Sequence, residues 1–300
     1  MSLFVMLIPL LAQVGPNPAA KPQDLPRELI ERPMQDAAKP DAQTLQPAQT
    51  PSPVQTGEPG LAECLADVRS DPVAALARAE AWSAGATGSV RAEALQCRGM
   101  ASSQLGGVED ARTDFVAALA AAPADDYGFR ARVGALAGNS ALAAGDNAGA
   151  LELLDVAATA AAAAGEGAPP DDSTLAGLIA IDRARALVAL GRNDEAASAL
   201  DAARRDAPGS AQAWLLSATL SRRMNRLDVA QRQIEQAAQL LPVDPEIGLE
   251  AGVIAMLLGR EDAAAKSWRS VIVAAPQSLS AQTAQGYLAQ IGQGTNIIGR

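Results

Sequence analysis

The sequence contains no histidine among its 300 residues. Without histidine a chain cannot build a Ser-His-Asp or Cys-His nucleophile system, or a metal site with histidine ligands. Carboxylate pairs remain available as acid and base groups. The adjacent pair Asp171 and Asp172, however, follows two prolines, as in a loop or a helix cap. We therefore predict no catalytic residues, no metal site and no cofactor.

Aromatic residues are scarce: they make up 3% of the chain, whereas hydrophobic residues of all kinds make up 49%. The core must therefore be built mainly from Ala, Leu and Val, and runs of the β-branched and aromatic residues that favour strands are nearly absent. This composition favours closely packed helices. The net charge of −10 disfavours a nucleic acid or an anionic membrane surface as partner, because both attract basic proteins.

The N-terminal part of the chain differs in composition from the rest. Residues 3–12 are apolar apart from Pro9, a run shorter than the about 20 residues that a membrane-spanning helix needs. The run matches the apolar region of a secretory signal peptide, although no Lys or Arg precedes it. We predict a signal peptide over residues 1–12, with a disordered apolar N-terminus as the alternative.

Prolines are concentrated after this apolar run. Ten of the 19 prolines lie between Pro16 and Pro59, among Gln, Thr, Ala and Asp. Such a stretch buries too little apolar surface to offset its ordering entropy, so residues 13–58 are predicted to be a Pro/Gln-rich disordered tether. Together the two segments predict an exported protein, in the periplasm of a bacterial cell. Its N-terminus would be associated with the membrane if the apolar segment is retained, and no stable membrane span would remain after cleavage.

Landmark residues in the rest of the chain return at an interval of 34 residues. Three prolines and three alanines show this spacing: Pro208, Pro242 and Pro276, and Ala196, Ala230 and Ala264. Units that start at Gly177, Ala211 and Pro245 fit one template, and two further units start at Ala92 and Ala131. One such unit buries little surface alone, so the interval predicts a stack of repeats.

The template has a physical explanation. Template positions are counted from the first residue of each 34-residue unit. Small residues at positions 8 and 20 let two antiparallel helices approach closely, and a large apolar residue at position 24 fills the space between neighbouring units. Pro at position 32 ends the second helix, but the second of the five units has Ala162 there. Four glycines at position 15 are expected to cap the first helix in the left-handed conformation: Gly106, Gly145, Gly191 and Gly259.

This pattern resembles the tetratricopeptide repeat family over about residues 60–276. The resemblance implies an all-α fold: a right-handed α-solenoid of about five helical hairpins over residues 59–293. A capping helix would close its C-terminal end, and residues 294–300 would form a frayed tail. The alternative is a generic α-solenoid or helical bundle, since position 4, which is large in the family, is small in three units: Gly134, Ala180 and Gly248.

Two segments depart from the 34-residue interval. Residues 165–176 are a 12-residue insertion, which we interpret as a longer loop, with a partner-binding loop as the alternative. Residues 60–82 resemble a shortened first unit, whose second helix begins at Asp71 and Pro72.

The resemblance further implies that the first helix of each unit lines a concave groove. Carried onto the last three units, it gives nine candidate partner-binding residues: Leu178, Ile181, Arg185, Leu215, Arg222, Arg223, Leu249, Val253 and Met256. An apolar groove with cations suits an extended or helical peptide that carries acidic residues. The alternative is that the apolar residues are core between helices and the arginines a solvated face.

The leading hypothesis is a non-catalytic, exported scaffold that binds a protein or peptide partner in this groove. An enzyme with its site in the groove is one alternative, but it needs a cluster of ionisable groups that the sequence does not show. A structural spacer of the cell envelope is another, and the Pro-rich segment suits it. The sequence does not identify the partner.

Cys64 and Cys97 are the only cysteines, and they are 33 residues apart. Because the first unit is shortened, both fall on the first helices of consecutive units, which lie about 8–10 Å apart. Export would place them in an oxidising compartment, so we predict a disulfide between them. Two buried thiols in an Ala-rich core are the alternative. A metal site is disfavoured, because two cysteines without histidine leave too few ligands.

Overall fold

The computed structural model describes residues 60–165 and 170–298 of the chain. The predicted signal peptide (residues 1–12) and tether (residues 13–58) lie outside these described residues. All regular secondary structure in the described ranges is α-helical, as the composition predicts. The helices belong to two compact units, one that ends before residue 166 and one that begins at Pro170.

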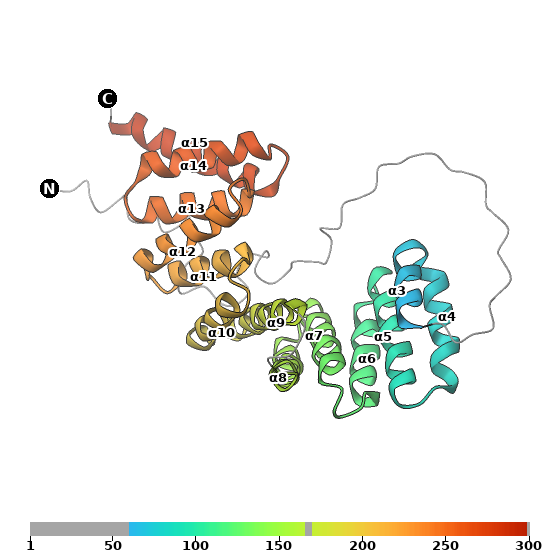
Figure 1. Cartoon of the computed structure of the whole chain (residues 1–300). Helices are drawn as coiled ribbons and strands as arrows, with labels where there is room; N and C mark the ends of the chain where they lie inside the picture. Colours follow the sequence, from blue (N-terminus) through green and yellow to red (C-terminus); the bar gives the residue numbers. More distant parts are fainter. Residues whose placement is uncertain (1–59, 166–169, 299–300) are drawn as a thin grey trace, which may run out of the picture. The chain divides into compact units, whose positions relative to one another are not determined.

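The first unit consists of three helical hairpins, each made of two consecutive helices (Figure 1). Its helices are α3 (Leu61–Ser70), α4 (Pro72–Gly85), α5 (Gly88–Gln104), α6 (Val108–Ala121), α7 (Tyr127–Ala143) and α8 (Asn147–Ala163). The second helix of each hairpin packs on the first helix of the next, so the hairpins stack in chain order.

The second unit repeats this arrangement and ends in a single helix. Its helices are α9 (Pro170–Ala189), α10 (Asn193–Asp206), α11 (Ala211–Arg223), α12 (Leu227–Leu240), α13 (Pro245–Leu257), α14 (Glu261–Ala274) and α15 (Leu279–Ile298). Five hairpins of the described residues correspond to the five full-length template units, and α3 with α4 forms the shortened first one. The predicted fold class, a stack of helical hairpins with a C-terminal capping helix, is therefore confirmed.

Residues at the template positions form the contact inside each hairpin. The position-24 residues of the five full-length units are all buried: Phe115, Leu154, Leu200, Ile234 and Trp268. In three hairpins the position-8 residue that faces this side chain is glycine. A Cβ atom added to these glycines would lie too close to the facing side chain: 2.6 Å between Gly99 and Phe115, 2.5 Å between Gly138 and Leu154, and 2.1 Å between Gly252 and Trp268. The other two hairpins have Ala184 and Ala218 there, opposite Leu200 and Ile234.

The turn inside each full-length hairpin has one conformation. The four predicted glycines have φ between +74° and +83°, so each is a left-handed C-cap. In the 34-residue repeat that starts at Ala211, Asn225 occupies the same position with φ +59°. Asparagine tolerates this conformation better than other non-glycine residues. In every case the amide of the next residue donates to a carbonyl five residues earlier, for example Arg226 N–H to Ser221 O at 2.8 Å.

Proline determines where the second helices end. Each of α6, α10, α12 and α14 is 14 residues long, and a position-32 proline lies two residues beyond its last residue. The helix α8 has Ala162 in place of this proline and extends to Ala163, a length of 17 residues. The insertion differs from the expected loop, because α9 begins within it at Pro170. Proline fits the first turn of a helix, where its missing N–H has no intrahelical partner.

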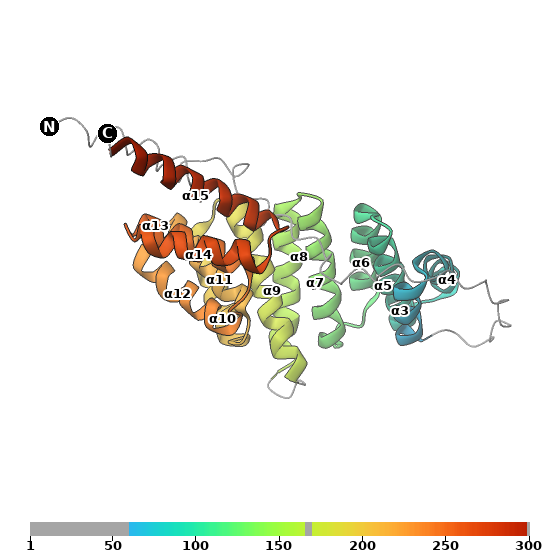
Figure 2. The same cartoon turned by 90° about the horizontal axis from the view of Figure 1, so that it is seen from above.

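The helix α15 caps the second unit. It packs on both α14 and α13, and in Figure 2 it runs along them at the end of the unit. The Tyr287 ring lies 5.0 Å from the Trp268 ring, centroid to centroid, and Ala281 and Ala284 are fully buried. The helix continues to Ile298 instead of ending before a tail at residue 294. No proline follows Pro276 to end it earlier.

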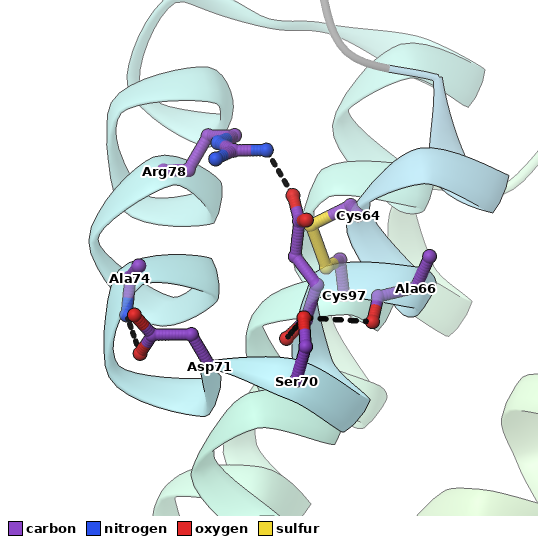
Figure 3. Close-up of polar contacts among 8 residues, drawn as sticks. Cys64, Ala66, Ser70, Asp71, Ala74, Arg78 and Cys97 are labelled. Carbon is purple, nitrogen blue, oxygen red and sulfur yellow. Dashed lines mark hydrogen bonds and ion pairs between the residues drawn. A yellow bond between two sulfur atoms is a disulfide. The ribbon is translucent and has the colours of Figure 1, made fainter. Parts of the chain in front are cut away.

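The N-terminal hairpin is attached to its neighbour through the two cysteines (Figure 3). Cys64 lies on α3 and Cys97 on α5, with Cα atoms 6.1 Å apart and sulfur atoms 1.91 Å apart, as in a disulfide. Both side chains are fully buried in a cluster of small residues of α3, α4 and α5. Arg78 of α4 also forms an ion pair with Asp67 of α3, so α3 is held from two sides.

We predict that denatured, non-reduced protein from its native compartment contains no free thiol, as measured by thiol counting. The bridge closes a loop of about 33 residues, which the chain-entropy model values at about 3–4 kcal/mol of unfolding free energy. The Cys64→Ala/Cys97→Ala protein should lose about this amount in urea unfolding, and reduced wild-type protein should behave like it. Two free thiols per chain would contradict the prediction.

Candidate functional site

The second unit contains a small pocket between α9, α10 and α11, which we call the α9–α11 pocket. Its lining residues are Ala184, Arg185, Val188, Leu200, Leu216, Leu220 and Arg223. Residues of α11 spaced by three and four positions lie on one face of that helix, which places Leu216, Leu220 and Arg223 together. The space available to the centre of a water-sized molecule is about 10 Å³, room for about one water. The pocket is thus mostly aliphatic, with two guanidinium groups.

Arg223 lies at the C-terminal end of α11 and is partly buried. Its Nη1 atom is buried, and no described residue accepts a hydrogen bond from it. Burial lowers the pKa of the Arg223 guanidinium below its ordinary value, and the positive charge of Arg222 lowers it further. The Glu250 carboxylate acts in the opposite direction. The Arg223 cation is therefore partly desolvated, and Nη1 lacks an acceptor among the described residues.

Arg222 has a different environment, although it is adjacent in sequence. Its Nε lies 2.6 Å from Oε1 of Glu250 on α13, and its Nη2 lies 3.3 Å from Oε2 of the same carboxylate. The two side chains are only 5% and 12% exposed. This bidentate pair joins two successive first helices, so the structure assigns Arg222 to the packing of the repeats and not to an open surface.

Arg185 lines the α9–α11 pocket from α9. Its Nη1 lies 2.6 Å from Oδ1 of Asp182, three residues earlier on the same helix, and both side chains are mostly buried. The negative charge of Asp182 offsets the positive charge of Arg185. The three arginines expected in the groove are thus distributed over three environments: an ion pair between helices, an ion pair within a helix, and the partly desolvated Arg223.

The predicted apolar residues also divide into groups. Leu178 is 47% exposed, and it lies two helical turns before Arg185 on the same side of α9. Leu215, Leu249 and Met256 are half-buried and pack against core clusters. Ile181 and Val253 are 1% and 7% exposed, so they lie in the core between helices, the alternative that the sequence left open. Among the predicted apolar residues, Leu178 offers the most surface to a partner.

Sequence reasoning did not identify Asp182 and Glu250 as partners of the groove arginines, or Leu216 and Leu220 as pocket residues. Asp182 could have been found, because a spacing of three residues on a helix brings side chains together. Glu250 is 28 residues from Arg222, and no local pattern relates the two. Their contact depends on how far one repeat is rotated relative to the next.

Residues 60–165 and 170–298 contain no cluster of three or more Cys, Asp or Glu side chains that could bind a metal ion. None of the helices in these ranges has both the length and the hydropathy that crossing a bilayer requires.

Successive helical hairpins that follow one 34-residue template, with a pocket lined mainly by first helices, define an α-helical repeat protein. Residues 179–220, which include most of the α9–α11 pocket, match the model of the tetratricopeptide repeat family. Over these residues the chain carries a tetratricopeptide repeat, as the sequence pattern indicated.

Several solved structures share this fold. PilF of Pseudomonas aeruginosa is 16% identical with a TM-score of 0.59, over 76% of this chain and 95% of that chain. PilW, described as a type IV pilus biogenesis factor, is 18% identical with a TM-score of 0.59, over 73% and 94%. The apo form of RapI is 10% identical with a TM-score of 0.61, over 74% and 67%. At these identities the likeness shows the fold alone. No curated protein sequence matches the chain.

The buried pair between Arg222 and Glu250 predicts a large stability effect. Glu250→Ala would leave the Arg222 charge buried without its carboxylate, and we expect a loss of about 3–5 kcal/mol in the free energy of unfolding. The matched control is Glu235→Ala on α12, an exposed position, where we expect a change within about 1 kcal/mol. Urea unfolding followed by circular dichroism measures both. Equal midpoints for the two variants would show that the pair does not stabilise the stack.

Proposed function

We propose that this protein is a non-catalytic interaction scaffold that binds a segment of a protein partner along the first helices of its C-terminal repeats. The observation that carries the proposal is the α9–α11 pocket, which is small, mostly aliphatic and lined mainly by first helices of consecutive repeats. Leu178 extends this surface along α9, because it lies on the same side of the helix as Arg185 and is exposed. Exposed apolar side chains beside a concave apolar pocket are typical of peptide-binding sites.

The composition of the pocket favours binding over catalysis. Its only ionisable lining residues are Arg185 and Arg223, and no carboxylate or cysteine lines it. General acid–base or nucleophilic catalysis needs a group that exchanges a proton or attacks the substrate near neutral pH, and arginine is a poor candidate for either role. Two arginines can orient and neutralise an anionic group. An enzyme with its site in the groove is therefore the weaker alternative.

Export is the second part of the proposal, and it rests on the sequence. The apolar segment at residues 3–12 has the length of a signal-peptide core, and the Pro-rich residues 13–58 would separate the repeats from the processed end. The paired cysteines suit an oxidising compartment such as the periplasm. A mature N-terminus at Met1 in cytosolic protein would contradict this part.

Site-specific crosslinking tests the binding surface. A photo-crosslinking residue at position 178, in protein expressed in its native cell, should capture a partner that the same residue at Lys266 does not. Lys266 lies on the second helix α14 and is exposed. The captured protein would then be purified and its affinity measured.

The affinity measurement compares two exposed leucines. Leu178→Asp should weaken binding of the purified partner about tenfold or more, since it places a charge in an apolar contact. Leu279→Asp, at a leucine that is 72% exposed on α15, should change affinity less than about twofold. If the protein is a spacer without a binding groove, both variants should have the same affinity and all crosslinker positions should capture the same proteins. That result would overturn the proposed function.

A further inference from the structure

We propose that the outer face of α15 binds the same face of a second copy of this chain, so that two α15 helices pair antiparallel about a two-fold axis at Gly286. The outer face consists of exposed residues on one side of the helix: Leu279, Gln282, Thr283, Gly286, Ala289 and Gln290. The inference goes beyond the proposed function and does not depend on it, since that function concerns the α9–α11 pocket and Leu178.

The two sides of α15 have different environments. On the inner side, Ala281 and Ala284 are fully buried. The Tyr287 ring, also on this side, contacts the Trp268 ring of α14. The outer-face residues follow the spacing of three and four positions that places side chains together on one side of a helix, and that side is exposed. The helix is thus attached to its own unit by its inner side only.

The outer face carries no charge, which is unusual for an exposed helix. Residues 270–299 contain no Asp, Glu, Lys or Arg, although these four types make up 19% of the chain. The solvent-facing side of a surface helix normally carries charged residues, whereas charged residues are depleted at the centres of protein interfaces. Leu279, at the start of α15, and Val273, shortly before it, are 72% and 83% exposed. An uncharged surface next to exposed apolar side chains indicates an interface.

Gly286 lies in the middle of the outer face, where no contact within the chain requires a glycine. A glycine inside a helix destabilises that helix relative to alanine. At Gly99, Gly138 and Gly252, a Cβ atom would collide with a facing side chain. A Cβ atom added to Gly286 would meet no atom of the described residues within 4 Å. A second helix that crosses α15 at Gly286 would therefore find no side chain in its way and could approach closely.

The charge of the chain favours a second copy as the occupant of this face. With a net charge of −10, two copies repel each other, and a contact that placed carboxylates opposite carboxylates would be strongly disfavoured. The outer face of α15 lets two copies meet without opposing like charges. A different protein that recognised an acidic chain through charge would bind where the carboxylates are, and this face has none.

The glutamines of the outer face also suit self-association. A two-fold interface uses the same surface on both copies, so that surface must be complementary to itself. An amide group meets this requirement because it both donates and accepts hydrogen bonds, whereas a carboxylate only accepts and a guanidinium or ammonium group only donates. With the axis at Gly286, Gln282 of one copy lies opposite Gln290 of the other. This amide pair occurs twice, on either side of the closest approach of the helices.

Paired charge substitutions in the full chain test the interface and its register. Gln282→Glu/Gln290→Glu would oppose carboxylates, and sedimentation equilibrium should show self-association about tenfold weaker or more. Gln282→Lys/Gln290→Lys should be weakened similarly, although it lowers the overall net charge and with it the general repulsion. Gln282→Glu/Gln290→Lys is the matched control and should dimerise at least as well as wild type, because each Glu would face a Lys. Equal dimerisation of all three variants would overturn the antiparallel pairing.

Substitution of Gly286 tests the close approach. Gly286→Leu should weaken self-association about tenfold or more, because the added side chains would hold the two helices apart. Its melting temperature should equal or exceed that of wild type, since leucine favours helix more than glycine and has open space here. Ala120→Leu, at an exposed alanine on α6 of the first unit, is the matched control and should leave the dimer unchanged. Wild-type dimerisation of the Gly286→Leu protein would overturn the inference.

The remaining outcomes separate this inference from the proposed function. A wild-type chain that stays monomeric up to about 0.1 mM, where a dimer with a micromolar Kd would be almost fully formed, would overturn the inference alone. Each chain of the dimer supplies its own α9–α11 pocket, so Leu178→Asp should leave the dimer unchanged. Likewise, a crosslinker at position 178 should capture the same partner from the Gln282→Glu/Gln290→Glu protein. Loss of that capture together with the dimer would contradict the independence of the two surfaces.

Discussion

One steric constraint underlies the arrangement of every full-length hairpin: a large side chain on the second helix lies against a small residue on the first. Where the large residue is Trp268, the facing residue is Gly252, and a single added carbon there would lie 2.1 Å from the indole nitrogen. This contact determines which face of the first helix turns toward its partner helix. In one hairpin the α9–α11 pocket adjoins this contact, because Ala184 and Leu200 line the pocket together with Arg185 and Arg223.

Close helix packing also determines which polar groups require partners inside the chain. Three polar side chains near the end of α11, Thr219, Ser221 and Arg222, are buried. Ser221 donates to Gln233 at 2.7 Å, and Arg222 binds Glu250. Buried polar groups in proteins nearly always have such partners. Arg223, one residue further along, departs from this rule, because no described residue accepts a hydrogen bond from its buried Nη1 atom.

The sequence predicted most of the fold because the repeats carry their own register. Proline, the small residues and the left-handed glycines act locally, so the helix ends could be placed without knowing the tertiary structure. Asn225 was missed because it occupies the glycine position with a different side chain, and the helical start at Pro170 because two prolines suggested a loop. The site was less predictable. Periodicity placed Arg222, Arg223 and Ile181 on a first helix, but only the packing of successive helices shows that Arg222 is paired, Ile181 buried and Arg223 left with a free donor.

A double-mutant cycle at Gly252 and Trp268 tests most directly whether complementarity between positions 8 and 24 determines the hairpin. Gly252→Ala in the wild-type background should cost about 1–3 kcal/mol in urea unfolding, because the buried indole cannot move aside. In the Trp268→Leu background, which recreates the Ala-with-Leu combination of Ala184 and Leu200, the same substitution should cost little. If the two positions are complementary, the coupling energy between them should be at least about 1 kcal/mol. Additive effects of the two substitutions would contradict it.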